Sequence, residues 1–235
     1  MNLAIDLGTS SVKIGCFEDG VLVGDVQKPT FEEIIDVVLG LSPDRIIISS
    51  VNQNALELKN KLQGDVMILD HTTPLPIKVK YNTPKTLGKD RIAAVVAANI
   101  QQPNKDTLVV DVGSCITYDF INKKNEYIGG SISPGIEMKL RAMNTFTAEL
   151  PLVSPDFGVE LVGDTTEKAL QSGTIYGTIA EIEEIVRMYK DKSPHLRFVI
   201  CGGGAESIGL KLKTTVEIYP ELVLLGLNGI LEYNV

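Results

Sequence analysis

Two short segments of the chain place an aspartate, a glycine and hydroxyl side chains at matching spacings. They lie in residues 3–13 and 107–119, where an apolar run leads to Asp6 and to Asp111, and a glycine follows each acid two positions later. Such a turn offers backbone amides and hydroxyls to a chain of phosphates, while the carboxylates hold the cations that accompany it. The repeated pattern therefore indicates a polyphosphate site, and the alternative is two β-turns with incidental acids.

Strands and helices alternate around both motifs in a similar order. In the first half, the patterning predicts strands at 3–7, from about 12, and at 20–24, 45–50 and 66–69, with helices from 30 and at about 52–62. In the second half, it predicts strands at 107–112, 115–122, 126–132, 197–201 and 214–219, with helices from 136, at about 166–189, after 204 and from 220. A further helix is predicted at 90–100. The repeated order predicts two α/β domains, residues 1–104 and 105–235, with a nucleotide cleft between them.

Two of the predicted helix starts carry specific signals. Thr30 is followed three residues later by Glu33, which is the spacing of a capping box. Pro220 suits the first position of the last helix, because the amide proton that proline lacks has no intrahelical partner there. We therefore expect helices to begin at these two residues.

The composition is that of a soluble globular protein. The chain has 235 residues, 44% of them hydrophobic, and a net charge of −8 without a basic run, which argues against nucleic acid binding through phosphate neutralisation. No apolar run reaches the length of a membrane span, so we predict no membrane contact. Cys16, Cys115 and Cys201 lack metal-ligand spacing and are interpreted as reduced core residues of a cytoplasmic protein. His71 and His195 are isolated, and neither is assigned a role.

A glycine cluster at residues 202–204 follows the apolar strand predicted at 197–201. Glycines between a strand and a helix let the backbone approach a flat ring closely and leave amides free. Together with the two acidic hairpins, this cluster resembles the superfamily of sugar kinases, actin and heat-shock chaperone ATPases. The resemblance implies a duplicated actin-like, ribonuclease H-like fold, in which the hairpins grip the phosphates of ATP and the glycine turn contacts the nucleoside.

Three further motifs are more specific. They are Tyr-Asn-Thr-Pro-Lys-Thr-Leu-Gly-Lys-Asp-Arg at 81–91, Gly-Gly-Ser-Ile-Ser-Pro-Gly at 129–135 and Thr-Ala-Glu-Leu-Pro at 147–151. In this order they closely resemble the type III pantothenate kinases, and the resemblance runs from Asp6 to Gly229. It implies ATP-dependent phosphorylation of pantothenate to 4′-phosphopantothenate, the first step of coenzyme A synthesis.

The resemblance also implies a role for individual residues. ATP contacts are implied for Asp6, Leu7, Gly8, Thr9, Ser10, Ser11, Val12, Lys13, Ser114, Gly202 and Gly203. Pantothenate contacts are implied for Tyr81, Gly88, Lys89, Asp90, Arg91 and Thr166, with Asp90 as the general base. The implied cations are K⁺ or NH₄⁺ at Asp111 and a divalent ion such as Mg²⁺ at Asp6. Because Thr166 reaches pantothenate from the partner subunit in this family, a homodimer with a shared site is implied.

The chain departs from the usual family pattern at both hairpins. Thr9 and Ser10 stand where the family usually has asparagine and threonine, and Ser114 stands where it usually has threonine. Each hairpin keeps a hydroxyl nearby, so we expect the phosphate contacts to persist.

The residues alone leave structural alternatives open. An acid beside the attacking alcohol can accept its proton late in a loose transition state, and an arginine can bind a substrate carboxylate as a fork. Asp90 is otherwise a helix cap followed by a solvated Arg91, Tyr81 a half-buried loop aromatic, Thr166 an N-cap and Lys13 a solvated strand residue.

Two other functions compete with the pantothenate kinase. A nucleotide-dependent regulator or assembly protein of the same superfamily would switch an interface and phosphorylate no metabolite. The loop at 81–91 favours the kinase, because it combines an acid, a forked cation and an aromatic ring. A kinase for another substrate, such as a sugar, ranks last, since 235 residues leave little room for the insertions common in sugar kinases.

Overall fold

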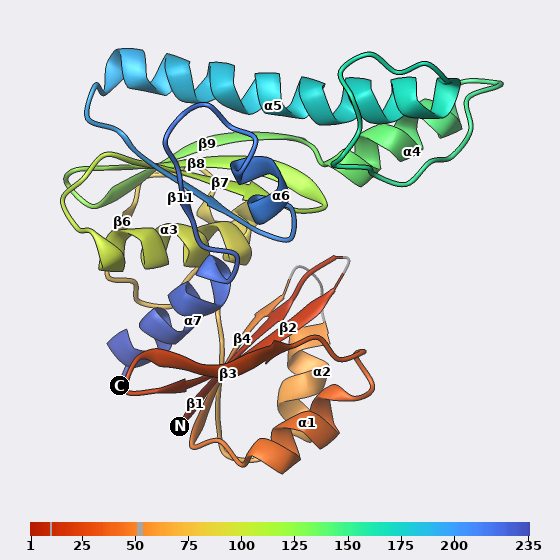
Figure 1. Ribbon diagram of the computed structural model, residues 1–235. Helices are drawn as coiled ribbons and strands as arrows, with labels where there is room; N and C mark the ends of the chain where they lie inside the picture. Colours follow the sequence, from red (N-terminus) through yellow and green to blue (C-terminus); the bar gives the residue numbers. More distant parts are fainter. Residues whose placement is uncertain (10, 51–53) are drawn as a thin grey trace. The chain divides into compact units, whose positions relative to one another are not determined.

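The computed structural model describes residues 1–9, 11–50 and 54–235. Its contacts divide the chain into two compact units (Figure 1). The first comprises residues 1–105, 121–129 and 221–235, and the second comprises residues 106–120 and 130–220. The sequence prediction placed all residues from 105 onward in the second domain, so this grouping differs from it at two segments.

The first unit is built on a mixed five-stranded sheet. The strand order is β3 (Val21–Gln27), β2 (Val12–Glu18), β1 (Asn2–Leu7), β4 (Arg45–Ser50) and β5 (Asp65–Ile68). Strand β1 pairs antiparallel with β2 and parallel with β4. Helices α1 (Ile34–Leu41) and α2 (Asn54–Lys61) contribute buried side chains to one core with alternate residues of β1 and β4, so they cover one face of the sheet.

Helices α3 (Lys89–Gln101) and α7 (Leu222–Tyr233) pack against each other and against the same sheet. A Cβ at Gly15 of β2 would approach Leu224 of α7, whereas the neighbouring Ile14 belongs to the core under α1 and α2. Helix α7 therefore covers the opposite face, because successive strand residues project to opposite sides. A Cβ at Gly226 would lie 1.8 Å from the Ala93 carbonyl oxygen, so the two helix backbones touch. This packing explains why residues 221–235 join the first unit.

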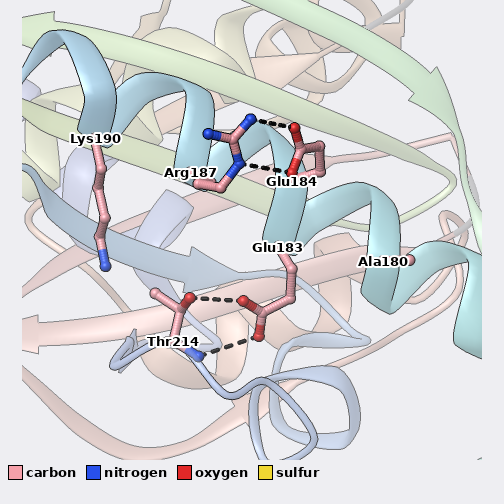
Figure 2. Close-up of a pocket in the computed structure, with 6 residues that line it drawn as sticks. All are labelled: Ala180, Glu183, Glu184, Arg187, Lys190 and Thr214. Carbon is pink, nitrogen blue, oxygen red and sulfur yellow. Dashed lines mark hydrogen bonds and ion pairs between the residues drawn. The ribbon is translucent and has the colours of Figure 1, made fainter.

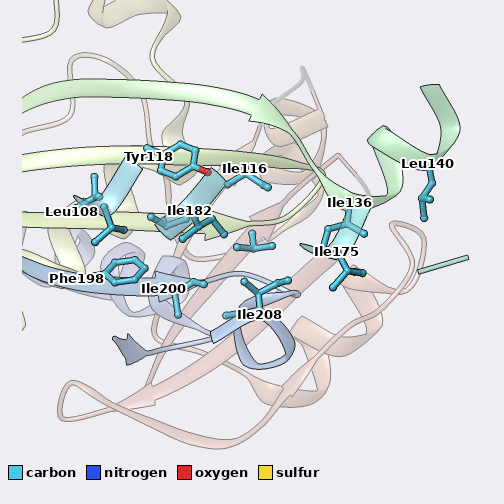
Figure 3. Close-up of a cluster of buried hydrophobic side chains, with 14 of the residues drawn as sticks. Leu108, Ile116, Tyr118, Ile136, Leu140, Ile175, Ile182, Phe198, Ile200 and Ile208 are labelled. Carbon is cyan, nitrogen blue, oxygen red and sulfur yellow. The ribbon is translucent and has the colours of Figure 1, made fainter. Parts of the chain in front are cut away.

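The second unit holds most of a six-stranded sheet and three helices. The order is β11 (Glu217–Ile218), β10 (Arg197–Cys201), β7 (Thr107–Val112), β8 (Cys115–Asn122), β9 (Glu126–Pro134) and β6 (Lys78–Val79). Helices α4 (Ile136–Phe146), α5 (Thr166–Lys192) and α6 (Ala205–Gly209) complete it. Figure 3 shows Ile182 of α5 against Leu108, Ile116 and Phe198 of the strands. Strand β6 and the ends of β8 and β9 fall in the first unit.

Most predicted elements are confirmed, and the differences lie at short or polar segments. The strand predicted at 214–219 is reduced to β11, and the last helix begins at Leu222 instead of Pro220. Strand β6 and the 3-10 helix η1 (Pro84–Thr86) were not predicted, since neither is long enough to show a hydrophobic period. The helix predicted from about residue 52 starts in residues that lie outside the described ranges.

The capping signal at Thr30 is confirmed in part. The Thr30 amide donates to the Glu33 carboxylate at 2.8 Å, as in a capping box, but a turn separates it from α1, which begins at Ile34. Among the helices in the described part of the chain, none is both long and apolar enough to cross a membrane. The three cysteines are free, as predicted, and Cys16 and Cys201 are buried.

Candidate functional site

The carboxyl of Asp6 lies in a row of side chains that crosses three strands. In the register of the first sheet, Asp6 of β1 is paired with Lys13 of β2 and with Ser49 of β4. Residues paired across neighbouring strands project from the same face. An acid, a cation and a hydroxyl therefore stand side by side near the end of β1.

The turn after β1 is closed by its backbone. The Gly8 amide donates to the Ser11 carbonyl oxygen at 3.1 Å, and a Cβ at Gly8 would stand 3.0 Å from the same oxygen. Any larger residue at position 8 would therefore crowd the turn. Thr9 and Ser11 are exposed, whereas the Leu7 side chain is buried, so a ligand at this turn would meet Leu7 through its backbone. Ser10 lies outside the described residues.

Asp6 interacts electrostatically with two other acids of the first unit. The pKa of the Asp6 carboxyl is raised from 3.8 to about 6, mainly by burial, and then by the charges of Asp90 and Glu221. The Ser49 hydroxyl and the Lys13 ammonium lower this pKa without offsetting the rise. The charge of Asp90, the acid to which the family resemblance gives the role of base, therefore acts on the acid of the first hairpin.

Lys13 is held by an acid from the far end of the chain. Its Nζ lies 3.1 Å from Oε2 of Glu221, and the two side chains are 17% and 24% exposed. The alternative of a solvated strand residue is thus wrong for Lys13. Glu221 directly precedes α7, and its side chain makes no capping hydrogen bond within the described residues.

The first turn of α3 fixes the position of Asp90. Oδ1 of Asp90 accepts a hydrogen bond from the Arg91 amide at 2.9 Å, so the acid does satisfy a free donor at the helix start. A Cβ at Gly88 would lie 2.4 Å from the same oxygen, which makes glycine necessary for this arrangement. Nζ of Lys89 donates to the Leu87 carbonyl oxygen at 2.9 Å. The capping and catalytic interpretations of Asp90 are compatible, because its second oxygen does not take part in this bond.

Arg91 and two tyrosines form a cluster beside Asp90. Arg91 is only 7% exposed, so the alternative of a solvated arginine is wrong, and its guanidinium carbon lies 6.0 Å from the centre of the Tyr81 ring. The Tyr81 and Tyr127 ring centres are 6.2 Å apart. At Gly129, φ is +127° and a Cβ would stand 3.2 Å from the Tyr81 ring. Gly129 thus leaves room for the Tyr81 ring. A larger residue would be strained at this φ and would crowd the ring.

In the second unit, glycines surround Asp111. Asp111, the penultimate residue of β7, is paired with Cys201 of β10, and a Cβ at Gly202, where φ is +89°, would lie 2.1 Å from Oδ1 of Asp111. Gly113 is also in contact range of this oxygen, at 3.4 Å for a Cβ. The Asp111 carboxyl therefore lies against the backbone of both glycines, and only glycine allows the approach at residue 202.

Two other residues predicted to bind nucleotide in the second unit, Ser114 and Gly203, are accessible. Ser114 is exposed, and no atom in the described structure would come within 4 Å of a Cβ at Gly203, so both leave room for a ligand. The Gly135 amide donates to the Ser114 carbonyl oxygen at 3.2 Å. A Cβ at Gly135 would collide with the carbonyl oxygen of Gly113 at 2.3 Å. The end of β9 thus supports the second hairpin through direct backbone contact.

Thr166 is the first residue of α5 and its side chain is exposed. The N-cap is Thr165, whose hydroxyl accepts a hydrogen bond from the Lys168 amide at 3.2 Å. The alternative of an N-cap role for Thr166 is therefore wrong by one residue.

A hollow of about 490 Å³ lies elsewhere in the second unit, and Figure 2 shows its lining. It is formed by Ala180, Glu183, Glu184, Arg187, Lys190 and Thr214. None of the predicted site residues is among them. Glu183 accepts hydrogen bonds from the Thr214 amide and hydroxyl and so ties α5 to the segment before β11, whereas Arg187 binds Glu184 within α5 itself.

Sequence reasoning missed three residues at these sites: Ser49, Tyr127 and Glu221. Ser49 carried a weak signal, as a polar residue at the end of a buried strand, whereas Tyr127 and Glu221 gave none without their partners. In the described ranges, no three His, Cys, Asp or Glu side chains gather as a metal cluster. A cation at Asp6 would therefore take further ligands from its substrate or from water, as Mg²⁺ usually does.

Comparisons with known proteins agree with the motifs. A family model described as type III pantothenate kinase matches residues 2–188. A type III pantothenate kinase from Phocaeicola vulgatus is 39% identical over 239 residues, which cover 100% of this chain and 99% of that protein.

Among solved structures, a Baf family protein from Campylobacter jejuni aligns with a TM-score of 0.66 and 22% identity over 99% of this chain and 98% of its own. An inorganic polyphosphate/ATP-glucomannokinase from Arthrobacter aligns with a TM-score of 0.53 and 13% identity, with 98% of each chain covered. These two structures show the fold, and the predicted actin-like α/β fold is confirmed.

Proposed function

The chain belongs to the type III pantothenate kinase family, and from this membership we propose that it transfers the γ-phosphoryl group of ATP to pantothenate. The products are 4′-phosphopantothenate and ADP, and the reaction is the first step of coenzyme A synthesis. The observation that carries the proposal is the row of Asp6, Lys13 and Ser49 across three strands at the first hairpin. The charge of Asp90, an acid suited to accept a proton, acts on the Asp6 carboxyl in the same unit.

Asp90 is the general base of the proposed reaction. The primary alcohol of pantothenate attacks the γ-phosphorus, the bond from phosphorus to the bridging oxygen breaks, and ADP leaves. The alcohol proton passes to the Asp90 carboxylate late in this loose transition state. The Arg91 amide holds one Asp90 oxygen at the helix start, so the carboxylate has a fixed orientation toward its substrate.

Arg91, Tyr81, Gly88 and Lys89 are proposed to bind pantothenate around this base. The burial of Arg91 beside the Tyr81 ring restricts its side chain, and a restricted guanidinium loses less entropy when it binds a carboxylate as a fork. Lys89 directly precedes Asp90 in the sequence, and the bond from its ammonium to the Leu87 carbonyl oxygen likewise restricts its side chain.

ATP contacts are proposed for both hairpins, residue by residue. In the first unit they come from Asp6 to Lys13, through the turn amides, the exposed hydroxyls and the Lys13 ammonium. In the second unit they come from Ser114, Gly202 and Gly203. Asp6 and Asp90 together form an excess of negative charge, which fits a divalent cation at Asp6. Such a cation supplies charge neutralisation of the phosphate oxygens.

Asp111 is proposed to bind K⁺ or NH₄⁺. Its carboxyl lies against the backbone at Gly202 and Gly113, and a carboxylate with nearby backbone oxygens is a suitable environment for a hard monovalent cation. We expect activity in potassium to fall by about ten-fold or more when a large organic cation replaces it. Initial rates at constant ionic strength in the two salts measure this, and equal rates would contradict the assignment.

A homodimer with a shared site is proposed from the surface around Thr166. Phe146 at the end of α4, and Leu152, Leu161 and Val162 in the segment that leads to α5, are all more than 60% exposed. Large apolar side chains exposed along one segment are typical of an interaction surface. Thr166 follows this segment directly and is itself exposed, so a subunit bound there would receive its hydroxyl.

Mixed dimers test the sharing of the site. Asp90→Asn and Thr166→Tyr subunits are each expected to be poorly active alone, but a re-associated mixture forms some sites from two intact contributions. Random pairing would restore roughly a quarter of the wild-type activity. Activity equal to the mean of the two separate variants would show that each site is built within one subunit.

The substrate assignment is tested with a panel of alcohols. Purified protein is incubated with ATP and pantothenate, several sugars or no acceptor, and the products are weighed by mass spectrometry. Phosphopantothenate as the dominant product is the expected result. ATP hydrolysis that is unaffected by pantothenate would favour the regulatory protein, and a phosphorylated sugar would favour the third candidate.

A cytoplasmic location without nucleic acid partners is part of the proposal. The three free cysteines are consistent with a reducing compartment.

A further inference from the structure

We propose that Glu221 is a positioning residue for ATP, because it holds the Lys13 ammonium in place at the first hairpin before the nucleotide binds. The inference rests on the proposed function, in which Lys13 contacts the phosphates. It adds a residue from the other end of the chain, outside every motif that the sequence presented.

The geometry of the pair supports this role. Nζ of Lys13 and Oε2 of Glu221 are 3.1 Å apart, and both side chains are mostly buried. Lysine has a long stem with many rotamers, and an exposed lysine would sample them freely. The ion pair selects a conformation in which the ammonium stays near the Asp6 row of the sheet.

The position of Glu221 is fixed by packing instead of by capping. It directly precedes α7, which packs against β1, β2 and α3. Although a residue at this position can cap a helix, the Glu221 side chain makes no capping bond in the part of the chain that the structure describes. The Glu221 carboxylate therefore binds Lys13, and the packing of α7 fixes the position of Glu221.

The burial of both charges makes the pair more than an ordinary surface contact. Exposed ion pairs contribute little, since water and salt screen them. Here the Lys13 and Glu221 side chains are only 17% and 24% exposed, so water and salt screen the pair less. A triphosphate that replaces Glu221 as the partner of Lys13 would find the ammonium already oriented.

The test combines Glu221→Ala, Glu221→Gln and Lys13→Met in the full-length protein. Glu221→Ala is expected to weaken binding of β,γ-imido-ATP by roughly ten-fold, measured by titration calorimetry, and to raise KM for ATP similarly. KM for pantothenate and kcat should change by less than about two-fold. Glu221→Gln keeps an acceptor oxygen and should recover part of the loss. In the Lys13→Met background, Glu221→Ala should have no further effect on binding.

Glu232→Ala is the matched control, since Glu232 is an exposed acid of the same helix that accepts a hydrogen bond from Asn228 at 3.0 Å. It should leave nucleotide binding unchanged.

Two outcomes would overturn the inference. One is wild-type nucleotide affinity in folded Glu221→Ala, and the other is an equal loss of affinity on Glu221→Ala with and without Lys13. Thermal melting of each variant shows whether it is folded. If Glu221→Ala does not fold, the binding of the nucleotide analogue to Glu221→Gln is the deciding measurement. Absence of pantothenate turnover in the wild type would defeat the proposed function alone, because the binding measurements do not depend on it.

Discussion

Replacement of Asp90 by asparagine is expected to lower kcat for pantothenate phosphorylation by about two powers of ten or more. Asparagine has nearly the same shape, and its side-chain oxygen can still accept the bond from the Arg91 amide that holds Asp90 at the start of α3. The amide cannot take up the proton of the attacking alcohol. The variant should therefore be folded and bind an ATP analogue with nearly normal affinity, while turnover fails.

Steady-state rates and calorimetric binding of the analogue measure the two halves of this prediction. Asp36→Asn is the matched control, because Asp36 is an exposed acid in the first turn of α1, in the same unit. It should behave as wild type. If Asp90→Asn kept full turnover, Asp90 would not be the base. A loss of turnover together with a loss of stability would instead indicate a structural role at the helix start.

Much of the fold could be predicted from the sequence, because most of its strands and helices have a characteristic residue composition. The strand at 45–50 is a continuous apolar run, and in the structure it is the central parallel partner of β1. Both acidic hairpins were predicted for a similar reason, since an acid near the end of an apolar strand is conspicuous. Strand β6 has only two residues and is defined by its pairing with Glu126 and Tyr127 of β9. So short an element leaves no local pattern in the sequence.

Less of the candidate site could be predicted from the sequence, because its contacts join distant parts of the chain. Lys13 meets Glu221 across 208 positions, and no local signal identifies the pair. Arg91 follows a helix start and so suggested a solvated side chain, yet it is buried beside Tyr81. At α5, two adjacent threonines are equally good caps in the sequence, and only the backbone conformation distinguishes Thr165 from Thr166.

Replacement of Asp6 by asparagine is expected to stabilise the protein while it impairs the kinase. The pKa of the Asp6 carboxyl rises from 3.8 to about 6 on folding, so the folded state binds this proton more tightly than the unfolded state. The ionised carboxyl therefore destabilises the fold above pH 6, and this effect fades as the pH falls from 6 toward 3.8. The shift corresponds to about 3 kcal/mol at most.

The sign of the stability change identifies its cause. Asp6→Asn should raise the melting temperature at pH 8, by about 2–4 °C for each kcal/mol gained, and the gain should disappear near pH 4. Calorimetric melting at several pH values without nucleotide measures it, and Asp65→Asn, at an exposed acid of the same sheet, is the matched control. Turnover should nevertheless fall by about a hundred-fold, because the charge that acts on the ATP cation is gone. A variant that melts at a lower temperature at pH 8 would mean that the ionised carboxyl holds the sheet together, and the charge repulsion from Asp90 would then be too weak to define a site.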